Sequence, residues 1–177
     1  MSKPIQLLID EHVYILKVVD ALIKECEEIE NGKEIDEKFF AKTIDFIRSY
    51  ADKFHHAKEE DILFKEMCKQ GTQEKLHCNP IDQMLHEHDL GREFVKNMED
   101  EVKEDNKEKV IENGRGYAQL LQEHIYKEDN ILYPMADEAL DNEELEEMEK
   151  KFMKIGIERK EDKERYTKFA KGVENKK

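Results

Sequence analysis

Apolar residues recur three and four positions apart along most of the chain, the spacing that places them on one face of an α-helix. Segments with this pattern alternate with short stretches that lack it. The pattern predicts five helices, over about 4–30, 36–69, 80–104, 106–135 and 141–172.

Residues that favour helix ends stand at these boundaries. Proline suits a first turn, Asn and Asp suit the capping position before it, and Gly suits the stop. The residues concerned are Pro4, Gly32, Gly71, Asn79, Pro80 and Asp141.

Short connections and the lack of a Gly/Ser linker predict a single all-α domain over 1–177. The first four helices should form an up-down four-helix bundle over about 4–137, and the fifth should pack on it as a C-terminal helical extension over about 141–172. Charged residues make up 42% of the chain and aromatic residues 8%, which favours long helices with wide polar faces over a β-sandwich.

The formal net charge of −14 disfavours binding to nucleic acid phosphates and docking on an anionic membrane. No apolar run approaches the length of a membrane span. The N-terminus lacks the apolar stretch of a signal peptide, so we expect a cytoplasmic protein.

Three cysteines do not make a disulfide framework and indicate reduced thiols. Cys68, His77 and Cys78 lie near one another in sequence and raise the possibility of a zinc site. They lack CxxC spacing and a clear fourth ligand, so we expect ordinary small side chains at a helix end and in a loop.

A repeat of polar residues within the predicted helices is the most informative feature. Helices one and three carry an acid followed by His, in "DEHVYIL" and "HEHDLGREFV". Helices two and four carry His-x-x-x-Glu followed by an apolar pair, in "HHAKEEDILF" and "HIYKEDNILY". The motif order His, HxxxE, His, HxxxE therefore indicates two successive helix pairs that carry the same pattern.

Helical phase indicates which of these residues face the bundle interior. At roughly 100° per residue, His12, His88 and His124 fall on the apolar faces of their helices and His86 points to solvent. In helix two, alignment with His124 and Glu128 favours an inward His55–Glu59 pair and an outward His56–Glu60 pair. The reverse phase stays open, because one residue of error exchanges the pairs.

Six inward polar groups need partners, because an unpaired buried carboxylate costs several kcal/mol. A metal cluster satisfies all of them together, and one Glu per facing helix can bridge two cations. The candidate ligands are His12, His55, Glu59, His88, His124 and Glu128. Nitrogen and carboxylate donors suit iron or manganese, and zinc would bind as well.

Four acids beside these residues have two interpretations, as partners that orient imidazoles or as solvated helix surface. They are Glu11, Asp61, Glu87 and Asp129. We expect surface for most of them.

The order of these motifs over about residues 5–137 resembles the hemerythrin-like, HHE cation-binding family. The resemblance implies a four-helix bundle around two iron ions joined by an oxo or hydroxo bridge, with Glu59 and Glu128 bridging and the four histidines as terminal ligands. It also implies a small ligand at the irons: oxygen, peroxide or nitric oxide.

This sequence departs from the family's oxygen carriers. The oxygen carriers have a fifth histidine in helix three, four residues from the first, whereas the residues four positions from His88 in this chain are Met84 and Arg92. The carriers also have HxxxxD in helix four, whereas this chain has HxxxE. The set is more similar to iron-centre repair proteins of nitrosative stress and to an iron-sensing domain. Three hypotheses follow: a di-iron protein that reacts with a small oxidant, an iron-binding or iron-donating module without turnover, and a metal-free structural bundle.

Overall fold

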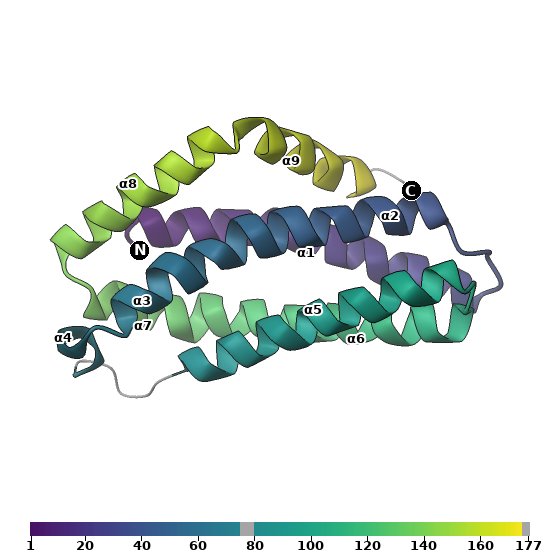
Figure 1. The fold of residues 1–177 in the computed structure, drawn as a ribbon, viewed down its shortest axis with the longest axis horizontal. Helices are drawn as coiled ribbons and strands as arrows, with labels where there is room; N and C mark the ends of the chain where they lie inside the picture. Colours follow the sequence, from purple (N-terminus) through teal and green to yellow (C-terminus); the bar gives the residue numbers. More distant parts are fainter. Residues whose placement is uncertain (75–79, 175–177) are drawn as a thin grey trace.

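The structure is a computed structural model that describes residues 1–74 and 80–174, and these residues contain no β-strand (Figure 1). Four long helical rods lie side by side in up-down order, as predicted. The first rod is α1 (Lys3–Glu30), and the third is α5 (Ile81–Lys103). The second rod consists of α2 (Glu37–Phe46), η1 (Ile47–His56), η2 (Glu59–Leu63) and α3 (Phe64–Met67). The fourth consists of α6 (Lys107–Lys127), η3 (Glu128–Leu132) and α7 (Tyr133–Ala139).

The predicted helix ends are confirmed in part. Gly32 follows α1 with a φ of +100°, a conformation that favours glycine. The second rod ends at Met67, before Gly71, which lies in the separate short helix α4 (Gln70–Gln73). Pro80 precedes α5 instead of lying in its first turn, and the predicted cap Asn79 lies outside the described residues.

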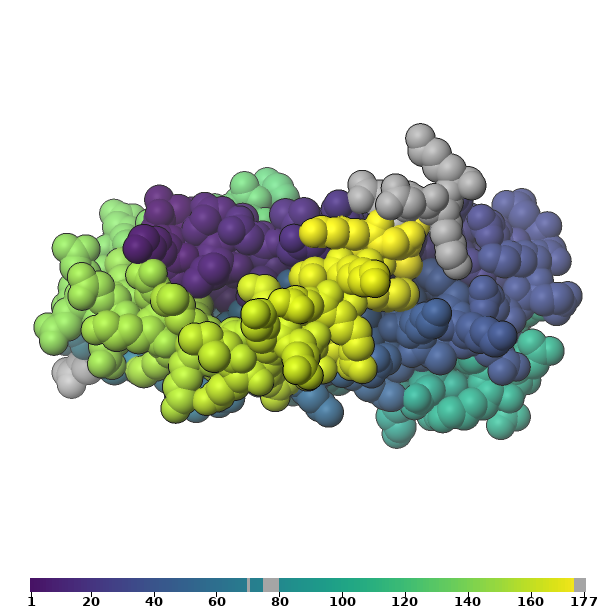
Figure 2. Space-filling view, turned by 90° about the horizontal axis from the view of Figure 1, so that it is seen from above, coloured from purple at the N-terminus to yellow at the C-terminus, as the bar shows by residue number. Residues whose placement is uncertain are grey.

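The predicted C-terminal helical extension is present, and it consists of two helices joined at Arg159. They are α8 (Asn142–Glu158) and α9 (Lys160–Glu174), and they arch over α1 and the second rod (Figures 1 and 2). Asp141 caps α8 in a capping box with Glu144, as its position predicted. The break at Arg159 lets the chain change direction, so that Phe152 packs near one end of the bundle and Tyr166 near the other.

Two apolar clusters form the core, and the polar residues of the repeat lie between them. On α1, Leu8 belongs to one cluster and Ile15 to the other, with His12 between the two. No helix among the described residues is long and apolar enough to cross a membrane.

Three segments of the bundle are π-helical: η1, η2 and η3. A π-helix closes its hydrogen bonds over five residues, so each residue turns through a smaller angle than in an α-helix. Such wide turns are frequent at functional sites. Here they carry or adjoin His55, His56, Glu59 and Glu128.

Candidate metal centre

The structure brings all six predicted residues together in the bundle interior, along with His56. The donor atoms form two groups, and within each group they lie within 4.8 Å of one another. The group with three histidines, here called position A, consists of His56, Glu59, His88 and His124. The group with two histidines, position B, consists of His12, His55 and Glu128.

Imidazole nitrogens from different helices face each other in pairs. The Nε2 atoms of His12 and His55 lie 2.9 Å apart, and those of His88 and His124 lie 3.1 Å apart. Two ligand atoms at right angles around a metal, each roughly 2.1 Å from it, are separated by about 3.0 Å. The spacing of both pairs therefore suits a shared cation.

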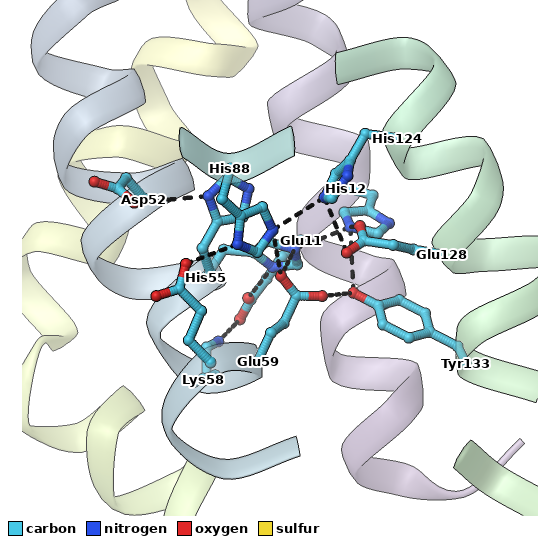
Figure 3. A network of polar contacts seen from close by, with 12 residues as sticks. Glu11, His12, Asp52, His55, Lys58, Glu59, His88, His124, Glu128 and Tyr133 are labelled. Carbon is cyan, nitrogen blue, oxygen red and sulfur yellow. Dashed lines mark hydrogen bonds and ion pairs between the residues drawn. The ribbon is translucent and has the colours of Figure 1, made fainter. Parts of the chain in front are cut away.

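The two glutamates each reach both positions. Glu128 places Oε2 at 3.2 Å from His12 Nε2 and Oε1 at 3.0 Å from His124 Nε2. Glu59 Oε2 lies 3.6 Å from His88 Nε2 and 3.8 Å from His55 Nε2 (Figure 3). Each carboxylate is thus placed between a position A histidine and a position B histidine, as bridging requires.

Every histidine of the centre directs its other ring nitrogen, Nδ1, at a carboxylate. The pairs are His12–Asp129 at 2.8 Å, His55–Glu11 at 3.0 Å, His56–Asp52 at 3.7 Å, His88–Glu60 at 2.7 Å and His124–Glu87 at 2.8 Å. Such a partner fixes the ring and assigns the N–H to Nδ1. The Nε2 lone pairs then point at each other across the centre, where a cation or a proton must separate them.

The expectation that the neighbouring acids are mostly surface is wrong for three of the four. Glu11, Glu87 and Asp129 accept hydrogen bonds from the site histidines. Asp61 is exposed and pairs with Lys65, as expected of surface. The error arose because each partner acid lies on a different helix from its histidine, a relation that phase on a single helix does not reveal.

Two lysines extend these contacts outward in the same way. Lys58 donates to Glu11, and Lys127 donates to Glu87. The sequence signal is that a Lys directly precedes Glu59 and Glu128 in the two copies of the repeat.

The prediction that His56 faces outward is wrong. Its side chain is buried, and its ring stacks on that of His88 with centroids 3.9 Å apart. The π-helical turns of η1 reduce the rotation between neighbours, so His55 and His56 both reach the interior. Glu60 lies at the boundary and bonds to His88 and Arg92. His86 is exposed, as predicted.

Sequence reasoning also missed Tyr133. Its buried hydroxyl donates to Glu59 Oε1 at 2.6 Å and lies 3.4 Å from His12 Nε2. Tyr133 stands five residues after Glu128, as Phe64 stands five after Glu59. Comparing the two copies of the repeat could have shown that Phe64 and Tyr133 are equivalent, and that only Tyr133 brings a hydroxyl to the centre.

The structure does not test the zinc hypothesis. Cys68 is a free, exposed thiol, whereas His77 and Cys78 lie outside the described residues.

Buried carboxylate oxygens at the centre lack partners other than the site histidines. Among the described residues, Glu59 Oε2 accepts no hydrogen bond, and the two oxygens of Glu128 face only the imidazole nitrogens of His12 and His124, at 3.2 and 3.0 Å. A buried carboxylate oxygen without a partner is costly, and a cation removes that cost. The donor types, the facing nitrogens and the orphaned oxygens all fit a pair of metal ions.

Without a cation, protons balance the charge of the centre. Burial opposes protonation of His12, but Asp129 and Glu128 outweigh it and raise the pKa of His12 to about 9. Glu128 and Glu87 likewise outweigh burial and raise the pKa of His124 to about 9. Burial and the neighbouring Glu128 raise the pKa of Glu59 well above its ordinary value. The metal-free centre therefore holds protons that a cation would displace.

The family model for the hemerythrin HHE cation binding domain matches residues 3–136. The chain therefore belongs to the hemerythrin HHE cation-binding family, as the order of its motifs indicated. No curated protein and no solved structure matches the chain. Family and geometry together define a metal-binding helical bundle whose His/Glu cluster holds the cation site.

Proposed function

We propose that this protein is a non-haem di-iron protein that binds or reacts with a small oxidant: oxygen, peroxide or nitric oxide. The observation that carries the proposal is the placement of Glu59 and Glu128 between two sets of facing histidines. Seven buried donors, five imidazoles and two carboxylates, make a set that suits iron or manganese and also accepts zinc.

Position B is the better candidate for a small ligand. It offers two histidines, whereas position A offers three, so a cation there keeps more coordination positions open. The Tyr133 hydroxyl lies beside position B, 3.4 Å from His12 Nε2, and its proton is donated to Glu59 Oε1, which holds that carboxylate in place. Iron, when bound, would supply these open positions and the electrons for reaction with an oxidant.

The protein residues fix geometry and access. Carboxylates behind each imidazole hold the rings in place, and apolar clusters flank the centre on two sides. We infer sensing or detoxification in redox or nitrosative stress as the task.

The second candidate function is an iron-binding or iron-donating module without turnover. The donor set supports this candidate as well, because the two groups of His and Glu ligands can hold cations whether or not an oxidant reacts there.

One experiment separates these functions. Tag-free protein is loaded anaerobically with ferrous iron and mixed with oxygen, peroxide or nitric oxide. A parallel loaded sample is mixed with an iron chelator. Binding of an oxidant, or its consumption once per loading with ferrous iron and repeatedly when a reductant is added, with iron retained, supports the first function. Rapid transfer of iron to the chelator without consumption supports the second. Absence of iron uptake by the folded protein contradicts both and leaves a structural bundle.

A further inference from the structure

Arg92 lies on α5, four residues after His88, and it binds two carboxylates of the second rod. Its Nε and Nη2 atoms donate to Asp52 Oδ1 at 3.0 and 2.7 Å, and Nη2 also donates to Glu60 Oε1 at 2.7 Å. A further bond joins Nη1 to Asp89 Oδ1 on α5 itself, at 2.8 Å. A guanidinium is planar and carries five N–H donors, so one arginine can hold several carboxylates in a fixed arrangement.

The two carboxylates of the second rod are those that face histidines of position A. Asp52 Oδ1, which accepts from Arg92, also lies 3.7 Å from His56 Nδ1. Glu60 Oε1, which accepts from Arg92 as well, lies 2.7 Å from His88 Nδ1. The two imidazole rings stack on each other, with centroids 3.9 Å apart and planes 11° from parallel. The arginine, the two acids and the two rings therefore form a closed circuit of contacts that spans two rods.

The two lysines behind the centre have a simpler arrangement. Lys58 binds the acid behind His55, and Lys127 binds the acid behind His124. Each lysine thus supports one imidazole, whereas Arg92 supports two imidazoles that belong to the same group of donors. Loss of the arginine should therefore act on position A and leave position B in place.

Burial distinguishes the outer part of this circuit from its inner part. The side chains of Arg92, Asp52 and Glu60 are 40%, 26% and 27% exposed. The rings of His56 and His88 are buried. Partly exposed ion pairs contribute little to the stability of a fold. A carboxylate at Nδ1, by contrast, fixes the orientation and the tautomer of a ring that binds metal, so the effect of the circuit is expected at the metal.

We propose that Arg92 is a positioning residue for position A: it holds the carboxylates behind His56 and His88, and thereby fixes both imidazoles for one of the two cations. The proposal rests on the two-cation centre of the proposed function, but it requires neither iron nor a reaction with an oxidant. A change at Arg92 should weaken one cation and spare the other.

Arg48 provides a matched control. Both arginines line a cavity of about 290 Å³ beside position A, and 41% of the Arg48 side chain is exposed. Its guanidinium donates to the two oxygens of Glu99 at 2.9 and 3.0 Å, and this acid contacts no site histidine among the described residues. Arg48→Gln and Arg92→Gln each separate a partly exposed arginine from its carboxylates, but only Arg92→Gln releases acids that support imidazoles.

Cobalt(II) is the probe, because it binds nitrogen and carboxylate donors and its visible absorption reports the coordination of the bound ion. Metal-free protein is titrated with cobalt(II) against a chelator, and helical content is recorded for every variant. We expect two ions per chain in the unmodified protein and in Arg48→Gln. Arg92→Gln should weaken one ion roughly 10- to 100-fold, leave the other within about twofold, and change the visible spectrum at saturation. Arg92→Lys should have a smaller effect, because a lysine keeps the charge without the planar fork.

A combined variant tests whether the arginine acts through the two acids. Asp52→Asn together with Glu60→Gln should weaken the same ion. Adding Arg92→Gln to this pair should then weaken it by less than about twofold more, because residues of one network do not act additively. A full effect of Arg92→Gln in that background would contradict the proposed route.

Equal weakening of both ions, equal effects of Arg48→Gln and Arg92→Gln, or unchanged binding in Arg92→Gln would overturn the proposal. If the unmodified protein binds two cobalt ions and Arg92→Gln binds them equally well, the positioning role alone fails. If the folded, unmodified protein takes up no cobalt, the two-cation centre fails and the role of Arg92 with it. If the cobalt results are as expected but iron-loaded protein neither binds nor consumes an oxidant, the oxidant function fails and the role of Arg92 stands.

Discussion

Lys58 and Glu11 form an ion pair inside the protein, with 2% and 4% of their side chains exposed (Figure 3). The second carboxylate oxygen of Glu11 accepts from His55 Nδ1 at 3.0 Å. The Lys58 ammonium also lies 3.8 Å from the centroid of the Phe54 ring and 5.7 Å from that of Phe152 on α8. A continuous polar chain thus joins the edge of position B to a lysine that packs against the C-terminal extension.

Removing one partner of this pair should destabilise the fold strongly. Lys58→Met leaves the Glu11 carboxylate buried without its main compensating charge, which typically costs about 3–5 kcal/mol. The free energy of unfolding, measured with urea on metal-free protein, should fall by this amount. Lys127→Met is the matched control, because Lys127 keeps 26% of its side chain exposed and its loss should cost less. Equal losses in the two variants would contradict a special role for the buried pair.

The carboxylates behind the imidazoles should tune metal affinity. Asp129→Asn replaces the acceptor of His12 Nδ1 and should weaken metal binding roughly 10- to 100-fold, the usual effect of losing such a partner. Competition against a chelator gives the affinity. Asp61→Asn is the control, because Asp61 is an exposed acid that pairs with Lys65 and contacts no site histidine among the described residues, and this change should have no effect. If both variants bind metal like the unmodified protein, the carboxylates do not orient the ligands.

His56 should be needed for position A. His56→Ala removes a buried imidazole from that group and should weaken metal binding at least tenfold, with the effect confined to one of two ions. His86→Ala is the control, since His86 is exposed on the neighbouring rod. Full retention of both ions in His56→Ala would show that His56 only fills space beside His88.

Metal binding should strengthen as pH rises from about 6.5 to 9. The raised pKa values of His12 and His124, about 9 against 6.5, stabilise the metal-free fold below pH 6.5, and this contribution disappears as pH rises through 9. A cation displaces the protons of His12 and His124, so the metal gains affinity over the same range. Unfolding temperatures of loaded and metal-free protein should therefore diverge from pH 6.5 to 9. A constant difference would contradict this linkage.

Much of the fold was accessible from sequence because its determinants are local. Apolar spacing predicted the four rods, and Gly32 and Asp141 marked helix ends correctly. The break at Arg159 was missed, because it depends on which end of the bundle Phe152 and Tyr166 pack against.

The inward placement of six buried polar residues at the centre was predicted from sequence, and the direction of His56 was predicted wrongly. His12, His88 and His124 lie on helices whose phase is near 100° per residue, so their inward direction followed from spacing. His56 lies in η1, where the π-helical turn changes the phase, and sequence spacing carries no sign of that turn. The hydrogen bond between Glu11 and His55 joins two helices, so it could not be predicted without knowing how those helices pack.

The claim that the two glutamates join two adjacent cations is tested most directly by stoichiometry. Metal-free protein without a histidine tag is titrated anaerobically with ferrous iron, and bound iron is measured per chain beside Glu128→Ala. We predict saturation at two irons per chain, and at one or none in the variant with the helical fold retained. Saturation of the unmodified protein at one iron, or no uptake by folded protein, would contradict the account.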